Sequence, residues 1–194
     1  MKTLLKTIND SIVIKKRLIN KQKKIALIIS ELYECLKNNK KILICGNGGS
    51  AADSDHLATE FIVRLRPKVN RKALKIFSLT FNTSTITATG NDYGFEKIFS
   101  RNLEAIGEKG DVLVALTTSG NSKNILKVLK LSKKMKIKSI GFLGYKGGKA
   151  KKLCDISLVI PSSNTARIQE EHKFLGHFIL EQIETMLLSD KKIK

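Results

Sequence analysis

The sequence of 194 residues contains no tryptophan, two prolines and three cysteines. The cysteines (Cys35, Cys45 and Cys154) are widely spaced within apolar patterns, which indicates reduced, buried thiols rather than a disulfide framework or a CxxC redox or zinc motif. Long apolar runs are also missing, because the apolar stretches have the length of strands and are interrupted by lysine. The first residues lack the apolar segment of a secretion signal. We therefore expect a cytoplasmic protein without a membrane partner.

Acidic residues are scarce: 17 Asp and Glu stand against 36 Lys and Arg, which gives a formal net charge of +19. Such an excess is typical of proteins that bind nucleic acid or anionic membranes. However, only six of the basic residues are arginines, aromatics make up 6% of the chain, and the lysines are scattered along helix faces. Nucleic-acid recognition uses arginine forks and stacking aromatics. We expect the lysines to lie on solvated helix faces, without a nucleic-acid partner; the alternative is a polyanion partner. Part of the positive charge would also attract a phosphorylated substrate.

What is present is an alternation of strand and helix patterns. A chain of 194 residues that is 42% hydrophobic suits one domain with a continuous core. An amphipathic helix is predicted over 3–38, with a break allowed near Asn20. The rest predicts an α/β fold with a five-stranded parallel sheet covered by helices on both faces, in a single domain 1–188 followed by a frayed tail 189–194. We expect strands at 41–45, 74–79, 111–116, 138–143 and 156–160, and helices at 51–64, 84–90 with 95–106, 122–134, 147–153 and 166–188.

The first candidate ligand loop is glycine-rich and joins the first strand to the next helix. Glycines within Gly46–Gly49 accept positive φ and let a ligand approach the main chain, and Ser50 or Asp53 would cap the helix. The same helix carries His56 and Glu60 four residues apart, so an imidazole and a carboxylate share one face. A Gly-x-Gly-Gly loop alone is weak evidence, but the titratable pair on the adjoining helix favours a functional site.

A second loop, Thr117–Ser122, places four hydroxyls around a glycine at the start of a helix. Hydroxyl donors, free N–H groups and the positive end of a helix dipole suit a phosphate monoester. The spacing is not that of a Walker loop, and the alternative is an ordinary Ser/Thr-rich helix cap. A further segment, Gly90–Gly94, reads as a turn in which Asn91 and Asp92 would accept sugar hydroxyls, or simply as a turn.

The last predicted helix carries a third group of polar residues. At 100° per residue, Gln169 and His177 lie close enough in angle to serve one site, whereas His172 lies too far round the helix. Each of these histidines could be purely structural. Together with His56 and Glu60, however, Gln169 and His177 offer two imidazoles, a carboxylate and an amide, which would suit zinc or an acid–base pair.

Four segments, 45–53, 90–95, 118–122 and 167–172, resemble in order and spacing the phosphoheptose isomerases of the sugar isomerase (SIS) superfamily. The resemblance spans nearly the whole chain. It implies a flavodoxin-like three-layer α/β sandwich that assembles as a homotetramer with active sites at subunit interfaces. It further implies conversion of sedoheptulose 7-phosphate to D-glycero-D-manno-heptose 7-phosphate through an enediol, the first step towards nucleotide-activated heptose for lipopolysaccharide or capsule.

The resemblance also assigns roles to individual residues. Local departures from the family pattern, at Ser54, Asp55 and Thr80–Asn82, affect loop contacts rather than the chemistry. The implied roles are Glu60 and His177 as the acid–base pair; His56, Glu60, Gln169 and His177 as zinc ligands; and Asn47, Gly48, Gly49, Glu60, Asn91, Asp92, Thr117, Thr118, Ser119, Ser122 and Gln169 as substrate-binding residues.

A non-catalytic reading has to be weighed as well. The replication-initiator-associating protein resembles the phosphoheptose isomerases throughout and serves as a protein-binding module, but it lacks the matching glutamate and the final histidine. This chain has both, as Glu60 and His177, which favours the enzyme. The segment before the first strand is also too short for the helix-turn-helix domain of phosphosugar-sensing regulators.

Overall fold

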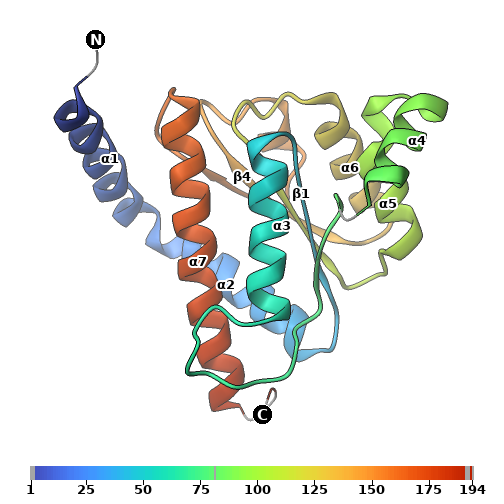
Figure 1. Cartoon of the computed structure of the whole chain (residues 1–194), viewed down its shortest axis with the longest axis horizontal. Helices are drawn as coiled ribbons and strands as arrows, with labels where there is room; N and C mark the ends of the chain where they lie inside the picture. Colours follow the sequence, from blue (N-terminus) through green and yellow to red (C-terminus); the bar gives the residue numbers. More distant parts are fainter. Residues whose placement is uncertain (1–2, 81, 191–192, 194) are drawn as a thin grey trace.

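The computed structural model describes residues 3–80, 82–190 and 193. These residues form a three-layer α/β sandwich around a five-stranded parallel sheet with the strand order β2-β1-β3-β4-β5 (Figure 1). The strands form where apolar runs are buried on both faces, as a parallel sheet between two helix layers requires. They are β1 Ile42–Gly46, β2 Ile76–Ser78, β3 Val112–Thr117, β4 Lys138–Leu143 and β5 Ile156–Val159.

The helices agree closely with the sequence pattern. The long final helix begins where the side chain of Asn164 accepts hydrogen bonds from the N–H groups of Ala166 and Arg167, at 3.0 and 3.3 Å. The helical elements are α1 Leu4–Leu18, η1 Ile19–Lys21, α2 Gln22–Lys37, α3 Gly49–Ile62, α4 Thr83–Tyr93, η2 Phe95–Lys97, α5 Ile98–Ile106, α6 Lys123–Lys134, η3 Lys149–Lys152 and α7 Thr165–Ser189.

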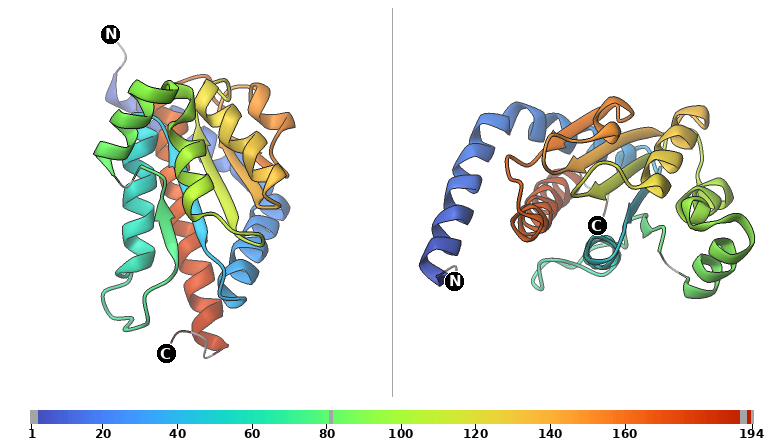
Figure 2. Two further views of the ribbon diagram at one scale, coloured as in Figure 1. Left: turned by 90° about the vertical axis from the view of Figure 1, so that its right-hand side faces the viewer. Right: turned by 90° about the horizontal axis from the view of Figure 1, so that it is seen from above.

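The strand side chains alternate between two cores, one on each face of the sheet. Ile42 and Ile44 of β1 pack with α2, α3 and α7, whereas Leu43 and Cys45 pack with α5 and α6. Figure 2 shows these two layers on opposite sides of the sheet. The parallel helices α3 and α7 therefore lie side by side on one face, and their N-termini lie at the edge where the strands end (Figure 1).

The leading helix is broken where the sequence allowed it. The 3₁₀ segment Ile19–Lys21 separates α1 from α2, and α1 leans away from the body of the molecule (Figures 1 and 2). Leu4 and Leu5 are 76% and 68% exposed. None of the helices formed by the described residues combines the length and apolar character that crossing a bilayer needs.

Three local expectations need comment. Gly90–Tyr93 belong to α4 rather than to a turn, so the predicted turn was wrong. α4 ends at Tyr93, and the next residue, Gly94, has a φ of 87°. Residues 191, 192 and 194 of the predicted frayed tail lie outside the described residues. Phe81, within the Thr80–Asn82 departure from the family pattern, also lies outside them. Ile193 is buried, and its carbonyl accepts a hydrogen bond from the Lys72 N–H at 3.1 Å.

Candidate active site

The glycine-rich loop lies between β1 and α3, at the point where the strand order reverses. β2 and β3 pair with opposite edges of β1, so the ends of β1 and β3 flank the position where open parallel sheets bind ligands. Gly48 adopts φ 54° and ψ −122°, which lets α3 begin directly at Gly49. Ser50 and Asp53 consequently lie inside the helix and do not cap it, which corrects the sequence interpretation.

The hydroxyl-rich loop follows β3 beside the glycine-rich loop. Reciprocal side-chain hydrogen bonds, at 2.9 and 2.8 Å, join Asn47 of the glycine-rich loop to Asn124 in the first turn of α6, directly after the hydroxyl-rich loop. Thr117 Oγ1 accepts a hydrogen bond from the Gly120 N–H at 3.2 Å. Ser122 immediately precedes α6, and its hydroxyl makes no capping bond to the helix. This arrangement leaves hydroxyl groups and the N-terminus of α6 at one place, as anion binding requires.

The remaining hydroxyl groups of that loop are accessible. Ser119 is exposed and Thr118 is half-buried. The Ser119 hydroxyl accepts a hydrogen bond from the Asn121 N–H at 3.2 Å. Gly120 has a φ of 66°, and a Cβ atom there would lie 2.1 Å from the Gly147 carbonyl oxygen, so the loop depends on glycine at this position.

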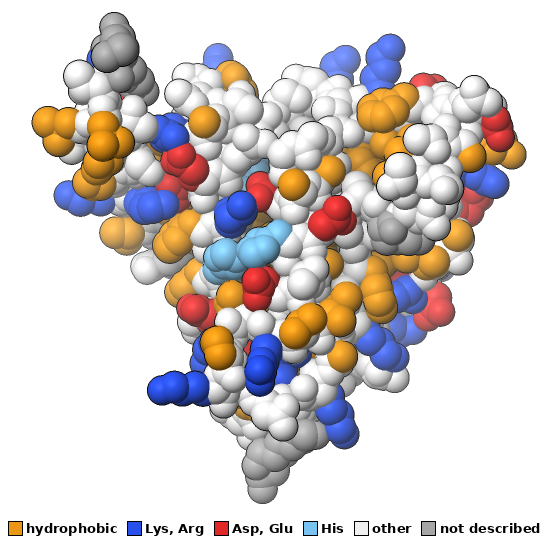
Figure 3. Space-filling model, viewed as in Figure 1, with side chains coloured by type: hydrophobic (Ala, Val, Ile, Leu, Met, Phe, Trp, Pro, Cys, Tyr) orange, Lys and Arg blue, Asp and Glu red, His pale blue; other side chains and the backbone are white. Residues whose placement is uncertain are grey.

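A cluster of titratable side chains lies between α3 and α7. The Nε2 atoms of His56 and His177 are 2.8 Å apart, and His56 Nδ1 lies 3.8 Å from Glu60 Oε1. Gly176 permits this approach, because a Cβ atom there would lie 2.6 Å from Leu57 Cδ2. Histidine side chains gather at one place on this face of the molecule (Figure 3). The structure thus brings together His56, Glu60 and His177, which the sequence predicted to share a site.

The electrostatics of the cluster favour a neutral His177. Burial lowers the pKa of His177 below its usual range, the neighbouring His56 lowers that pKa further, and Glu60 opposes these effects. Since the two Nε2 atoms share one hydrogen bond, one imidazole donates the proton and the other accepts it. A neutral imidazole beside a carboxylate can accept and return a proton near neutral pH.

Gln169 lies nearer the strand ends than the other polar residues of α7. A Cβ atom on Gly49 would lie 2.5 Å from Gln169 Nε2, so the amide packs directly on the glycine-rich loop. His177 lies about 12 Å further along α7. A pocket of about 390 Å³ opens beside Gln169, where Lys173 forms a 3.1 Å ion pair with Asp53. Within one chain, the structure therefore does not join Gln169 to the histidine cluster.

The side chains at the cluster have the chemistry of a zinc site but not its finished geometry. Two imidazoles and a carboxylate are common zinc donors, and the Nε2 atoms of His56 and His177 converge. Glu60, however, faces the opposite nitrogen of the His56 ring. Among the described residues, no group of three or more His, Cys, Asp or Glu side chains is arranged to hold a metal ion. The imidazoles and the carboxylate fit zinc by type, but within one chain Gln169 lies too far along α7 to join them.

Asn91 and Asp92 lie apart from this cluster. They belong to the last turn of α4, which packs on the opposite face of the sheet from α7 (Figure 2). The Asn91 side-chain amide donates a 2.8 Å hydrogen bond to the Asp92 carboxylate, and both residues are exposed. The structure of one chain does not bring them to His177.

His172 agrees with the helical-angle argument. Its side chain is buried, and its ring centroid lies 6.0 Å from that of Phe142 on β4. Burial lowers the pKa of His172 to about 4, against smaller opposing effects of the Leu143 backbone and of Asp53. His172 is thus a neutral core residue at neutral pH and does not join the cluster at His177.

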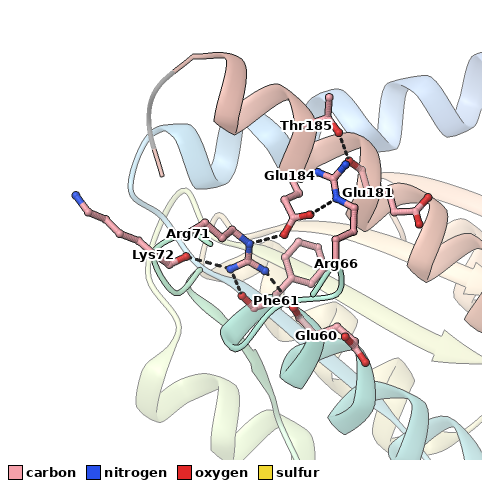
Figure 4. Close-up of polar contacts among 8 residues, drawn as sticks. All are labelled: Glu60, Phe61, Arg66, Arg71, Lys72, Glu181, Glu184 and Thr185. Carbon is pink, nitrogen blue, oxygen red and sulfur yellow. Dashed lines mark hydrogen bonds and ion pairs between the residues drawn. The ribbon is translucent and has the colours of Figure 1, made fainter. Parts of the chain in front are cut away.

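Sequence reasoning missed one group that adjoins the cluster. Arg66 and Arg71, from the loop after α3, both pair with Glu184 of α7, and Arg71 also contacts the last turn of α3 (Figure 4). The only sequence signal is that a basic loop follows the helix that carries Glu60. Contacts between a loop and a helix more than 100 residues away have no local pattern.

Comparison with known proteins agrees with this fold. Residues 8–144 match the SIS domain family. The chain is 43% identical to a phosphoheptose isomerase of Clostridium acetobutylicum over 84% of this chain and 83% of that protein, and 50% identical to one of Campylobacter jejuni over 79% and 81%. The structure of a phosphoheptose isomerase from Francisella tularensis matches with a TM-score of 0.88 at 34% identity, covering 94% of this chain and 99% of that chain. The structure of a phosphoheptose isomerase from Neisseria gonorrhoeae matches with a TM-score of 0.85 at 37% identity, covering 92% of this chain and 95% of that chain.

Proposed function

The chain belongs to the phosphoheptose isomerase family of SIS domain proteins, and from this premise we propose that it converts sedoheptulose 7-phosphate to D-glycero-D-manno-heptose 7-phosphate. The observation that carries the proposal is the convergence of Glu60, His56 and His177 between α3 and α7. A module that only binds protein has no need of a carboxylate and two imidazoles at one place.

The reaction moves a carbonyl group from C2 to C1 of the sugar. A base removes a proton from C1, an enediol forms, and a proton returns to C2 while a second group moves protons between the two oxygens. Glu60 is the carbon acid–base, because a carboxylate can both take and return this proton. His177 is its partner at the oxygens, since its lowered pKa keeps the imidazole neutral and able to accept a proton. His56 lies between them and orients His177 through the 2.8 Å contact.

The phosphate group of the substrate binds at the loop Thr117–Ser122. Accessible hydroxyls at Ser119 and Ser122 and the N-terminus of α6 support this assignment. Binding energy from the phosphate, remote from C1 and C2, positions the reacting carbons. Sugar hydroxyls are bound by the glycine-rich loop with Asn47 and by Gln169, and Asn91 and Asp92 complete the set.

Zinc is proposed as a cofactor held by His56, Glu60, Gln169 and His177. When bound, zinc would polarise the sugar carbonyl as a Lewis acid. The proposal is supported by the donor types and by the converging imidazoles. Added zinc should raise the melting temperature of the native chain, and His177→Gln should abolish that rise. Equal zinc stabilisation of both proteins would exclude this site.

We further propose a homotetramer in which neighbouring subunits complete each active site. Along α3, Glu60 lies about 16 Å from the glycine-rich loop. One sugar phosphate is too short to bind its phosphate group at the loops and also place its reacting carbons at Glu60 of the same chain. The exposed apolar residues of α1 and a groove of about 350 Å³ between α2 and α7 support an interface with other copies. Light scattering should give a tetramer. Exchanging subunits between Glu60→Gln tetramers and tetramers that carry Ser119→Ala and Ser122→Ala should restore activity, because some sites then combine an intact histidine cluster with an intact phosphate loop from a neighbour. A monomer would refute the assembly, and a tetramer without complementation would refute the shared site.

The product would then supply heptose for activation by a nucleotide and transfer into lipopolysaccharide or capsule, in the cytoplasm where sugar nucleotides form. The test of the function is incubation with sedoheptulose 7-phosphate, followed by NMR. The aldose should appear with the native chain, whereas Glu60→Gln and His177→Gln should lose about 10²–10⁴-fold in rate. An unchanged ketose, together with tight binding of a replication protein, would favour the alternative of a protein-binding module.

A further inference from the structure

A buried carboxylate links the end of α3 to α7. Glu184 of α7 has a side chain that is 3% exposed, and it accepts hydrogen bonds from Arg66 Nε at 2.6 Å and Arg71 Nε at 2.5 Å. A buried charge of this kind is tolerated only when it is fully paired. The two arginines differ in their surroundings: the Arg71 side chain is 1% exposed and that of Arg66 is 36% exposed. Arg71 is therefore the inner partner.

The outer nitrogens of Arg71 hold the backbone at the end of α3. Nη2 donates to the Glu60 carbonyl at 3.1 Å, and Nη1 donates to the Phe61 carbonyl at 2.8 Å (Figure 4). Nη1 also donates to the Lys72 carbonyl at 3.0 Å. The last carbonyls of a helix have no partner within the helix, and a cation there also interacts favourably with the helix dipole. Arg71 thus caps the turn of α3 that carries Glu60.

We propose that Arg71 is a positioning residue for the Glu60 carboxylate. One planar guanidinium ties the main chain of Glu60 to Glu184, which lies about two turns from His177 on α7. It therefore fixes the turn that carries Glu60 relative to the helix that carries its catalytic partner. A lysine cannot reproduce this, because its ammonium group lacks the rigid fork that reaches two elements at once. This inference rests on the proposed isomerase function.

Arg66 provides the matched control. It pairs with the same carboxylate, but among the described residues its side chain makes no hydrogen bond to α3. If the network served only to neutralise Glu184 and to hold the fold, changing either arginine would act through stability and leave the turnover of folded protein unchanged. If Arg71 positions Glu60, only Arg71 variants lower turnover in protein that is still folded.

The experiment compares kcat and KM for sedoheptulose 7-phosphate in the native chain, Arg71→Lys, Arg71→Ala and Arg66→Lys, at a temperature where circular dichroism shows each to be folded. Arg71→Lys should lower kcat by about 10–100-fold with KM within about twofold, since small misplacements of a reacting group have effects of this size. Arg66→Lys should stay within about twofold in both constants. Millimolar methylguanidinium should restore part of kcat to Arg71→Ala and should leave the kcat of Arg66→Lys unchanged.

Three outcomes would overturn the proposal: a folded Arg71→Lys with native kcat, a loss that appears only in KM, or equal losses of kcat in Arg71→Lys and Arg66→Lys. If Arg71→Lys does not fold, Arg71→Ala with and without methylguanidinium decides, and absence of rescue would count against the proposal. A native chain that leaves sedoheptulose 7-phosphate unchanged would instead refute the proposed function, and this inference with it. The two failures are therefore distinguishable.

Discussion

Acid should destabilise the protein through His172, and the size of the effect follows from its burial. The pKa of His172 is about 4 in the folded chain, because burial penalises the imidazolium, against about 6.5 for an exposed histidine. Between these values the unfolded chain binds the proton and the folded chain does not, so stability is lost as pH falls below about 6.5. Linkage with these two pKa values gives a loss of about 2 kcal/mol between pH 7 and pH 5 and about 3 kcal/mol in the limit of lower pH.

Urea unfolding at pH 7, 6, 5 and 4, at one fixed protein concentration, measures this loss. In His172→Leu and His172→Gln the free energy of unfolding should fall by about 2 kcal/mol less between pH 7 and pH 5 than in the native chain. The comparison depends on the change with pH, so it does not matter how stable each variant is at pH 7. Identical pH dependence in all three proteins would show that His172 is not the buried neutral group described here.

Three further substitutions test the proposed phosphate loop and the contact between α3 and α7. Ser119→Ala and Ser122→Ala should raise KM for the phosphorylated sugar with little effect on the fold, because each removes one accessible hydroxyl from the proposed phosphate loop. Steady-state kinetics measures KM, and circular dichroism checks the fold. An unaltered KM would count against phosphate binding at this loop. Gly176→Ala should lower the free energy of unfolding by about 1–3 kcal/mol and also lower kcat, because its Cβ atom would meet Leu57 at 2.6 Å and push α7 from α3. Native stability and native kcat in this variant would contradict the packing argument.

The strands were predictable because each is a short apolar run bounded by polar or glycine residues. Predicted and observed ends of β1, 41–45 and Ile42–Gly46, differ by one residue. α4 was harder, because Gly90 and Asn91 favour a turn locally. The helix continues through them to Tyr93 and is capped at its start by Asn82, whose side chain accepts a hydrogen bond from the Thr85 N–H at 3.1 Å. Neighbouring structure overrides weak local propensity there.

The histidine cluster was partly predictable, because residue spacing within a helix determines which side chains share a face. His56 and Glu60 share a helix face by spacing alone, and helical angles on the last helix favoured His177 over His172. The resemblance to the isomerases added the roles of these residues. The position of Gln169 depends on how α7 is aligned along the axis of α3. Angles around a single helix do not give this alignment. Arg71 was unpredictable, because its role depends on a loop that returns to the end of α3. Sequence periodicity indicates which residues share one face of a helix or strand. Only the three-dimensional fold shows which loop packs against that face.

The most direct test of the central claim is solvent exchange at the reacting carbon. The native chain and Glu60→Gln would be incubated with sedoheptulose 7-phosphate in D₂O, and deuterium next to the carbonyl group would be followed by NMR. The account predicts that the native chain incorporates deuterium during isomerisation and that Glu60→Gln, still able to bind the sugar, does so about 10²–10⁴-fold more slowly. Equal rates of incorporation in the two proteins would contradict the assignment of Glu60 as the carbon acid–base.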